Sequence, residues 1–250
     1  MSNSKMVDYV KYSPNNSGKR SHKIDRITPH CAVGQLSIET LGDMFSKSST
    51  DASSNYGIGA DGRIGMYVPE DMVSWCSSNQ PNDNRAVTIE CASALKSPYK
   101  MKDDVYKTLV RLCVDICRRN GKTKLIWISD KDSALSYQPA DNEMLITVHR
   151  WFARKSCPGK WLFDRLGKLA EEVNKQIEPK KIYRIQAGAF KKSANAVNLM
   201  TRLRKAGYKD AFTKYDGGFY HVQVGAFNKR ANAEKMLRKM QADGFTGIIK

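Results

Sequence analysis

The sequence has no run of about 18 apolar residues, so no segment is expected to span a membrane. Its first residues, MSNSKMVDYV, lack the apolar stretch of a secretory signal peptide. We therefore expect synthesis in the cytoplasm without export through the Sec pathway. The six cysteines of this 250-residue chain show no spacing typical of a disulfide framework. Cys113 and Cys117 lie one helical turn apart among apolar residues, which favours buried free thiols.

Acidic residues are scarce relative to basic ones, and the imbalance is concentrated at one end of the chain. The sequence has 42 Lys+Arg against 25 Asp+Glu, a formal net charge of +17. Residues 181–250 carry 15 basic and 4 acidic side chains (+11), whereas residues 1–180 carry 27 and 21 (+6). Such a charge predicts a polyanionic partner: nucleic acid, anionic lipid or an acidic polymer of a bacterial wall.

Apolar periodicity predicts strands that alternate with helices in residues 1–173, after a polar and mostly irregular start. The clearest helix covers residues 103–119 and ends just before a glycine. A hairpin is predicted over residues 53–67, around the Asp-Gly turn at Asp61. This alternation indicates an α/β domain whose sheet is covered by helices. Its other strands and helices are predicted over 24–30, 37–45, 87–91, 125–128, 145–148 and 161–173.

An internal repeat in residues 182–250 indicates a second domain. Residues 183–190, YRIQAGAF, match residues 220–227, YHVQVGAF, at an offset of 37, and each copy continues into a helix that ends at a glycine. The repeat predicts a small βαββαβ unit, preceded by a charged linker over residues 174–181. Strand alternation places four polar side chains on the sheet face turned away from the helices: Arg184, Gln186, His221 and Gln223.

Residues 149–159, HRWFARKSCPG, place an imidazole and a thiol eight residues apart. An apolar run that reads as a strand precedes His149, and the Pro-Gly pair predicts a turn directly after Cys157. Imidazole nitrogen and thiolate sulfur both bind zinc, at roughly 2.0 to 2.3 Å. The best candidate for a third ligand is His30, at the end of the first predicted strand. Three protein ligands leave a fourth position open, which is typical of catalytic zinc.

Glu90 is the anomalous charge in the apolar strand predicted over residues 87–91. A buried carboxylate is costly without a partner, so Glu90 is either half of a structural ion pair or a catalytic base. Burial would raise the pKa of Glu90 and a nearby cation would lower it, and the sequence does not decide between them.

The combination of His30 with the motif H-x5-K-x-C-P-G resembles the zinc site of type-2 N-acetylmuramoyl-L-alanine amidases, over residues 20–170. The resemblance implies the fold shared with peptidoglycan recognition proteins, a mixed central sheet with flanking helices. It also implies zinc bound by His30, His149 and Cys157, with Glu90 as the base. Lys155 would stabilise the oxyanion; otherwise it is a solvated surface lysine.

One position departs from the family. Some branches carry a tyrosine in the strand before the Asp-Gly turn, and the matching position here is Ser54. Tyr56 lies two residues further on, so we do not transfer the role of that tyrosine to it, and more is expected of Glu90. Trp75, Trp151 and Tyr56 either line a sugar- or peptide-binding groove or pack in the core.

The repeat resembles the SPOR (sporulation-related repeat) domain over its whole length. In that family the sheet face binds glycan strands without stem peptides, which implies glycan binding by the four polar side chains named above. A merely solvated face is the alternative. A basic βαββαβ unit also resembles an RNA-recognition motif, but the aromatic-rich RNP1 pattern is missing, so no nucleic-acid partner is expected.

These observations predict a two-domain peptidoglycan hydrolase that cleaves the amide between N-acetylmuramic acid and L-alanine with a zinc-activated water. Its second domain is expected to bind wall glycan, and its basic surface to bind anionic wall polymers such as teichoic acids. Without a signal peptide, it is expected to reach the wall as a phage or prophage endolysin through a holin pore, or as an autolysin after lysis. The alternative is a non-catalytic peptidoglycan-recognition protein. The intact Cys157 argues against it, because such relatives tend to lose a zinc ligand.

Overall fold

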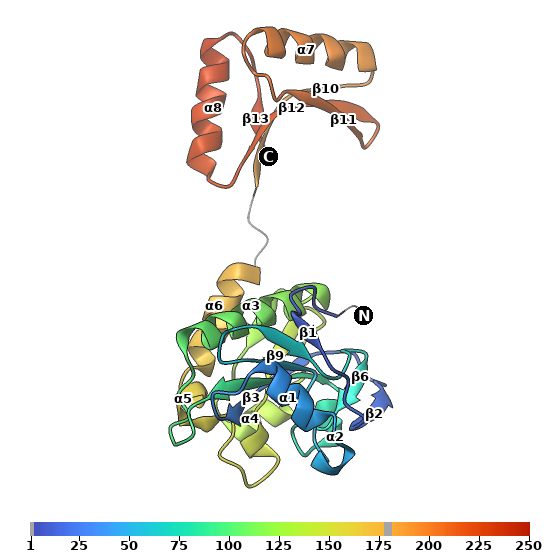
Figure 1. Ribbon diagram of the computed structural model, residues 1–250. Coiled ribbons are helices and arrows are strands. Elements are labelled where there is room, and N and C mark those ends of the chain that lie inside the picture. The colour runs from blue at the N-terminus through green and yellow to red at the C-terminus, as the bar shows by residue number, and fades with distance from the viewer. Residues whose placement is uncertain (1–2, 178–181) are drawn as a thin grey trace. The chain divides into compact units, whose positions relative to one another are not determined.

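The computed structural model describes residues 3–177 and 182–250. They belong to two compact units, Met1–Glu178 and Pro179–Lys250 (Figure 1). Each unit has its own hydrophobic core. The predicted fold class, an α/β domain with a mixed sheet followed by a small α+β repeat unit, is confirmed.

The N-terminal unit is built on one seven-stranded sheet. In spatial order its strands are β1 (Tyr9–Val10), β5 (Ile64–Met66), β4 (Tyr56–Ile58), β7 (Ala86–Ser93), β3 (Arg26–Val33), β9 (Glu143–Ile146) and β8 (Lys124–Ile126). All neighbours run parallel except β4 and β5, which form the predicted hairpin. The N-terminal region expected to be irregular contains β1 and also β2 (Asn16–Lys19), which pairs with β6 (Met72–Ser74).

Helices cover both faces of this sheet (Figure 1). On one face α3 (Asp103–Arg119) and α6 (Leu166–Ile177) pack over the main core. On the other face α1 (Ile38–Phe45) packs Leu41 against the buried Tyr67. The shorter segments are α2 (Gln80–Asp83), α4 (Lys131–Ser136), α5 (Gly159–Phe163) and the 3-10 turns η1 (Ser48–Thr50) and η2 (His149–Trp151).

Side-chain alternation along β3 and β7 separates an apolar face from a polar one. Ile27 and Ile89 belong to the core beneath α3. His30 and Glu90 are direct partners in the parallel register and point to the opposite face. The predicted base and the predicted first ligand are therefore side by side because of strand pairing.

A buried polar layer holds the strands on that second face. The Asn82 amide donates to Thr28 Oγ1 (3.1 Å), and its carbonyl oxygen accepts from Thr147 Oγ1 (3.0 Å). The two threonine hydroxyls are 2.7 Å apart. Each of these three polar side chains thus has a partner, and the layer ties α2 to β3 and to the residue after β9.

The helix predicted over residues 161–173 is two helices, α5 and α6. The Arg165 backbone N–H bonds to the Leu162 carbonyl (2.9 Å), which tightens the turn between them. The Trp161 carbonyl accepts from the Arg165 side chain instead (3.0 Å). A single helix is interrupted because a side chain replaces the backbone donor at that carbonyl.

The linker predicted over residues 174–181 begins as helix, because α6 continues to Ile177. The Asn174 side chain bonds to both backbone groups of Leu125 in β8 (2.6 and 2.8 Å). Ile177 is buried one turn further along. These contacts hold the end of α6 against the sheet edge. Positions 178–181 of the predicted linker lie outside the described residues.

The C-terminal unit has the predicted βαββαβ order. Its elements are β10 (Tyr183–Phe190), α7 (Ser193–Lys205), β11 (Phe212–Asp216), β12 (Phe219–Phe227), α8 (Arg230–Ala242) and β13 (Ile248–Ile249). The strands form an antiparallel sheet in the order β11-β12-β10-β13. Both helices pack on one face of it, because their buried Leu203 and Met240 share a core with Ile185 and Val222.

Candidate metal centre and active site

His30, His149 and Cys157 converge on one point of the N-terminal unit. Their candidate ligand atoms all lie within 4.8 Å of one another. Cys157 Sγ is 3.3 Å from His30 Nδ1, and the two imidazole centroids are 5.1 Å apart. His30 comes from β3, His149 opens η2 directly after β9, and Cys157 lies in the turn before α5. Because β3 and β9 are adjacent parallel strands, their carboxyl ends bring the two histidines together.

The electrostatics of the cluster suit a cation. Burial, and then the neighbouring His149, hold the pKa of His30 well below its ordinary value. Burial and the Lys155 charge lower the pKa of His149. Both imidazoles are therefore neutral, the form that binds a metal.

The donor set fits zinc. Cys157 offers a thiol whose pKa is raised by the hydrogen-bonded Cys31 thiol, by burial and by the Glu90 charge. A dication reverses that effect and favours the thiolate. His30 Nε2 is buried without a hydrogen-bond partner in the described residues, whereas Nδ1 faces Cys157. Two neutral imidazoles and one thiol match the three protein ligands of a catalytic zinc.

Glu90 lies beside this cluster. Its Oε1 is 3.8 Å from His30 Nδ1, its side chain is 18% exposed, and its Oε2 is buried without a partner among the described residues. Burial raises the pKa of Glu90 to about 7. Within the described ranges no Lys or Arg forms an ion pair with Glu90, and its one contact of this kind is with the neutral His30, so the alternative of a structural ion pair finds no support. A carboxylate placed and tuned in this way can exchange protons near neutral pH.

Two residues near the cluster were not predicted from the sequence. Cys76 Sγ lies 3.9 Å from Glu90 Oε1, and Cys76 forms a second possible metal-binding group with His30 and Glu90. Ser78 Oγ lies 3.1 Å from His149 Nε2, with a left-handed backbone φ of 58°. Both belong to the loop after β6, whose backbone N–H groups are held by the Asp83 carboxylate. No spacing in the sequence links this loop to the motif around Cys157.

Lys155 is exposed, and no carboxylate in the described part of the chain pairs with it. Its charge lowers the pKa of His149, so it acts electrostatically on the cluster. The sequence left open whether Lys155 is a solvated lysine or part of the site, and the effect of its charge on the pKa of His149 is consistent with the second interpretation.

The three aromatic candidates for a binding groove, Tyr56, Trp75 and Trp151, differ in their exposure to solvent. Tyr56 is fully buried and donates to Glu70 (2.6 Å), which pairs with Arg119, so it belongs to the core beneath α3. Trp151 is buried and stacks on Trp127 with centroids 5.4 Å apart.

Trp75 is 39% exposed and is the one candidate of these three that remains available for a groove. Ser54 is also buried, with its hydroxyl donating to the backbone carbonyls of Tyr56 and Thr88. Ser54 occupies the position at which some branches of the family carry a tyrosine, but its buried hydroxyl does not face a substrate.

In the C-terminal unit the predicted polar face is formed. Gln186 pairs with Gln223 across β10 and β12, while the apolar Ile185 and Val222 are buried under the helices. Arg184 is exposed and His221 is half-buried. The exposed aromatic rings of Phe212 and Phe219, on the neighbouring β11 and β12, were not predicted.

Two family models match the chain. One, described as N-acetylmuramoyl-L-alanine amidase, matches residues 20–160 and so covers more than half of the chain. The other, described as SPOR domain, matches residues 179–250. The protein belongs to the N-acetylmuramoyl-L-alanine amidase family, and it carries a C-terminal SPOR domain. No helix within the described residues has the length and apolar character needed to cross a bilayer.

Several solved structures are similar to parts of the chain. The peptidoglycan binding domain of the B. subtilis cell wall lytic enzyme CwlC is 35% identical and covers 28% of this chain and 86% of its own, with a TM-score of 0.26. The N-acetylmuramoyl-L-alanine amidase LysC from Clostridium intestinale is 16% identical and covers 69% and 99%, with a TM-score of 0.47. A mutant endolysin from Bacillus subtilis is 16% identical and covers 67% and 99%, with a TM-score of 0.45. No curated protein matches the chain at a significant level.

Proposed function

We propose that this protein hydrolyses the amide bond between N-acetylmuramic acid and L-alanine of the peptidoglycan stem peptide, with zinc held by His30, His149 and Cys157. The observation that carries the proposal is the convergence of these side chains beside the Glu90 carboxylate. Membership of the amidase family supports the reaction type. When bound, zinc supplies Lewis acidity, which polarises an amide carbonyl and makes water more acidic.

The surrounding residues supply the remaining chemistry. Glu90 accepts the proton of the attacking water and delivers a proton to the leaving amine of L-alanine; a pKa near the working pH suits both transfers. Lys155 carries a positive charge beside His149 and stabilises the negative charge that develops on the carbonyl oxygen. The buried His30 and the Asn82 layer hold these groups in place before substrate arrives.

Digestion of purified sacculi by the full chain tests this function. We expect new L-alanine amino termini and no new reducing sugar ends. Adding a chelator should remove the bound metal and stop formation of the product. New reducing ends would indicate glycosidase chemistry and contradict the proposal. Binding to sacculi with no products at all would make the protein a recognition protein instead.

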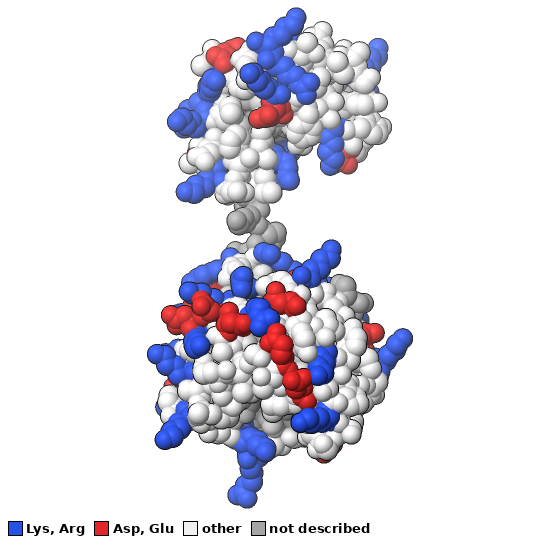
Figure 2. All heavy atoms as spheres, in the orientation of Figure 1, with Lys and Arg blue, Asp and Glu red and all other residues white. Residues whose placement is uncertain are grey.

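We further propose that the SPOR domain binds wall glycan through Arg184, Gln186, His221 and Gln223, and that its basic surface holds teichoic acids. Figure 2 shows Lys and Arg spread over the visible surface of this unit, with few acidic side chains. In the described residues of this unit only two ion pairs occur, Lys214–Asp216 and Arg230–Glu234, so most of its cations are available to an external anion.

The teichoic-acid contribution should depend on salt. Binding of the full chain to walls stripped of teichoic acid is expected to be weaker than to intact walls at low salt. The difference should vanish at roughly 1 M salt, where the Debye length is about 3 Å. Lys235→Gln with Arg238→Gln in α8 should reduce the difference, while Lys107→Gln with Lys168→Gln in the amidase unit should not. A difference that persists in high salt would exclude an electrostatic origin.

The combination of a lytic and a wall-binding domain supports an endolysin-like role, in which the protein acts on the wall after release from the cytoplasm. Cells that express it should lyse only when a holin is co-expressed. Lysis without a holin would rule out this route.

A further inference from the structure

A basic pocket of about 420 Å³ lies beside the candidate metal centre. It is formed between the start of α4 and the segment that connects His149 to Cys157. Among the described residues that line it there is no Asp or Glu. The lining residues are Lys131, Arg150, Trp151, Phe152, Ala153, Arg154 and Lys155.

Ring contacts and a hydrogen bond hold the wall of the pocket. The Arg150 guanidinium lies 4.6 Å from the centroid of the Phe163 ring and donates to the Ser156 carbonyl (2.5 Å). Trp151 stacks on Trp127 with only 2° between the rings, and Phe163 contacts Trp127 edge-on. The positive charge of Arg150 is therefore fixed in position rather than carried on a free side chain.

The pocket adjoins the reacting position. Arg150 directly follows His149, and its backbone N–H donates to the carbonyl of Cys157 (3.1 Å). Lys155 lines the pocket and lies two residues before Cys157. The pocket therefore lies along the segment that carries two of the three candidate metal ligands.

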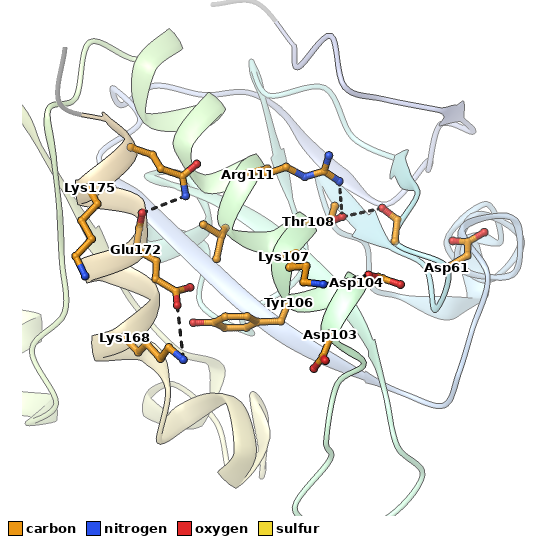
Figure 3. Close-up of a pocket in the computed structure, with 13 residues that line it drawn as sticks. Asp61, Asp103, Asp104, Tyr106, Lys107, Thr108, Arg111, Lys168, Glu172 and Lys175 are labelled. Atoms are coloured by element: carbon orange, nitrogen blue, oxygen red, sulfur yellow. Dashed lines mark hydrogen bonds and ion pairs between the residues drawn. The ribbon is translucent and has the colours of Figure 1, made fainter. Parts of the chain in front are cut away.

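The charges of the pocket are not balanced by the protein. No carboxylate within the described ranges forms an ion pair with Lys131, Arg154 or Lys155. A larger cavity of about 870 Å³, between α3 and α6 on the opposite face of the sheet, differs in this respect (Figure 3). There Lys168 pairs with Glu172 and Lys107 with Asp104, each at 3.7 Å. Lys131, Arg154 and Lys155 therefore present positive charge to a ligand, with no carboxylate among the described residues lining the pocket.

We propose that this pocket binds a carboxylate of the stem peptide close to the scissile amide, and so makes Lys131 and Arg154 specificity-determining residues. The inference rests on the proposed amidase function. A carboxylate suits the site because guanidinium and ammonium groups donate charge-assisted hydrogen bonds to its two oxygens. The residue after L-alanine follows it at about 3.8 Å between Cα atoms, and we assign its carboxylate to the pocket.

The test uses two soluble muramoyl peptides that differ only in the second stem residue, which carries either a free α-carboxylate or the corresponding carboxamide. The full-length, zinc-loaded wild type is expected to prefer the carboxylate about tenfold in kcat/KM, with the difference in KM. Lys131→Ala with Arg154→Ala should reduce this preference to about one. The control Lys107→Ala with Lys168→Ala removes the same charge from the opposite side of the domain and should retain the preference.

The outcomes separate the two proposals. Cleavage of both peptides with equal KM by the wild type would overturn the carboxylate pocket while leaving the amidase intact. Failure to cleave either peptide or sacculi would instead contradict the proposed function. If the preference survives in the Lys131 and Arg154 variant, the pocket is not its source. The wild type could instead show no carboxylate preference and be inhibited competitively by a wall-derived polyphosphate. That result would show that the pocket binds phosphate groups and not a carboxylate.

Discussion

Replacing Glu90 by glutamine is expected to lower kcat for release of L-alanine termini about a thousandfold, since positioned acid–base groups contribute roughly 10²–10⁴-fold. Glutamine keeps the size of the side chain and removes its ability to exchange a proton. The structure supports this site because Glu90 is the carboxylate beside His30, with its pKa raised to about 7 by burial. The measurement is steady-state hydrolysis of sacculi by zinc-loaded protein, with bound zinc quantified in parallel.

The stability of the same variant shows whether lost activity reflects lost structure. The pKa of Glu90 is raised from 4.5 to about 7 by burial, so the folded metal-free protein binds more protons than the unfolded chain between these values. The contribution of Glu90 to the free energy of unfolding is therefore fully present below pH 4.5. It decreases by up to about 3 kcal/mol as the pH rises to about 7.

Glu90→Gln lacks this titration. With chelator present, its free energy of unfolding should equal that of wild type at low pH and exceed it above neutrality. A variant less stable than wild type at all pH values would show that the carboxylate is structural, and the catalytic assignment would lose its support.

The second large effect concerns the thiol ligand. Cys157→Ala is expected to weaken zinc binding by at least about a thousandfold and to lower hydrolysis to the level of chelator-treated wild type. Loss of a residue that merely orients a ligand costs roughly 10–100-fold in metal affinity, and loss of the ligand itself costs more. Competition with a chromophoric chelator measures the affinity. Added zinc should raise the melting temperature of wild type and not of the variant, because a metal stabilises the state that binds it.

Cys117→Ala is the matched control. Cys117 is a buried thiol in α3, beneath the opposite face of the sheet. Its removal should lower stability modestly through a small cavity and leave zinc affinity and hydrolysis unchanged. Wild-type zinc affinity in Cys157→Ala would refute the ligand assignment, and would direct attention to Cys76, which shares His30 and Glu90 in the alternative grouping.

Much of the fold follows from local patterns. The repeat at an offset of 37 predicted the whole C-terminal unit, since two equal strand–helix–strand units bury their apolar faces only against each other. The longer N-terminal strands and helices were predicted in type and order. The features that were missed include the short segments β1, β2, β6, α2 and α4 and the break between α5 and α6. Each depends on a partner distant in sequence or on one side chain bonding to the backbone.

What the sequence indicated by itself is the set of candidate reacting groups. His149 and Cys157 were predicted as metal ligands because their spacing is local, and Glu90 was predicted as a base because a charge in an apolar strand requires a reason. Tertiary structure decided the rest: which strands are neighbours, which face each residue shares, and how loops distant in sequence meet. It brought Cys76 and Ser78 to the centre, buried Tyr56 and Trp151, and joined α4 to the loop after His149 as a basic pocket. Spacing along a strand or helix is set by backbone geometry, whereas proximity between elements is set by packing of the whole domain.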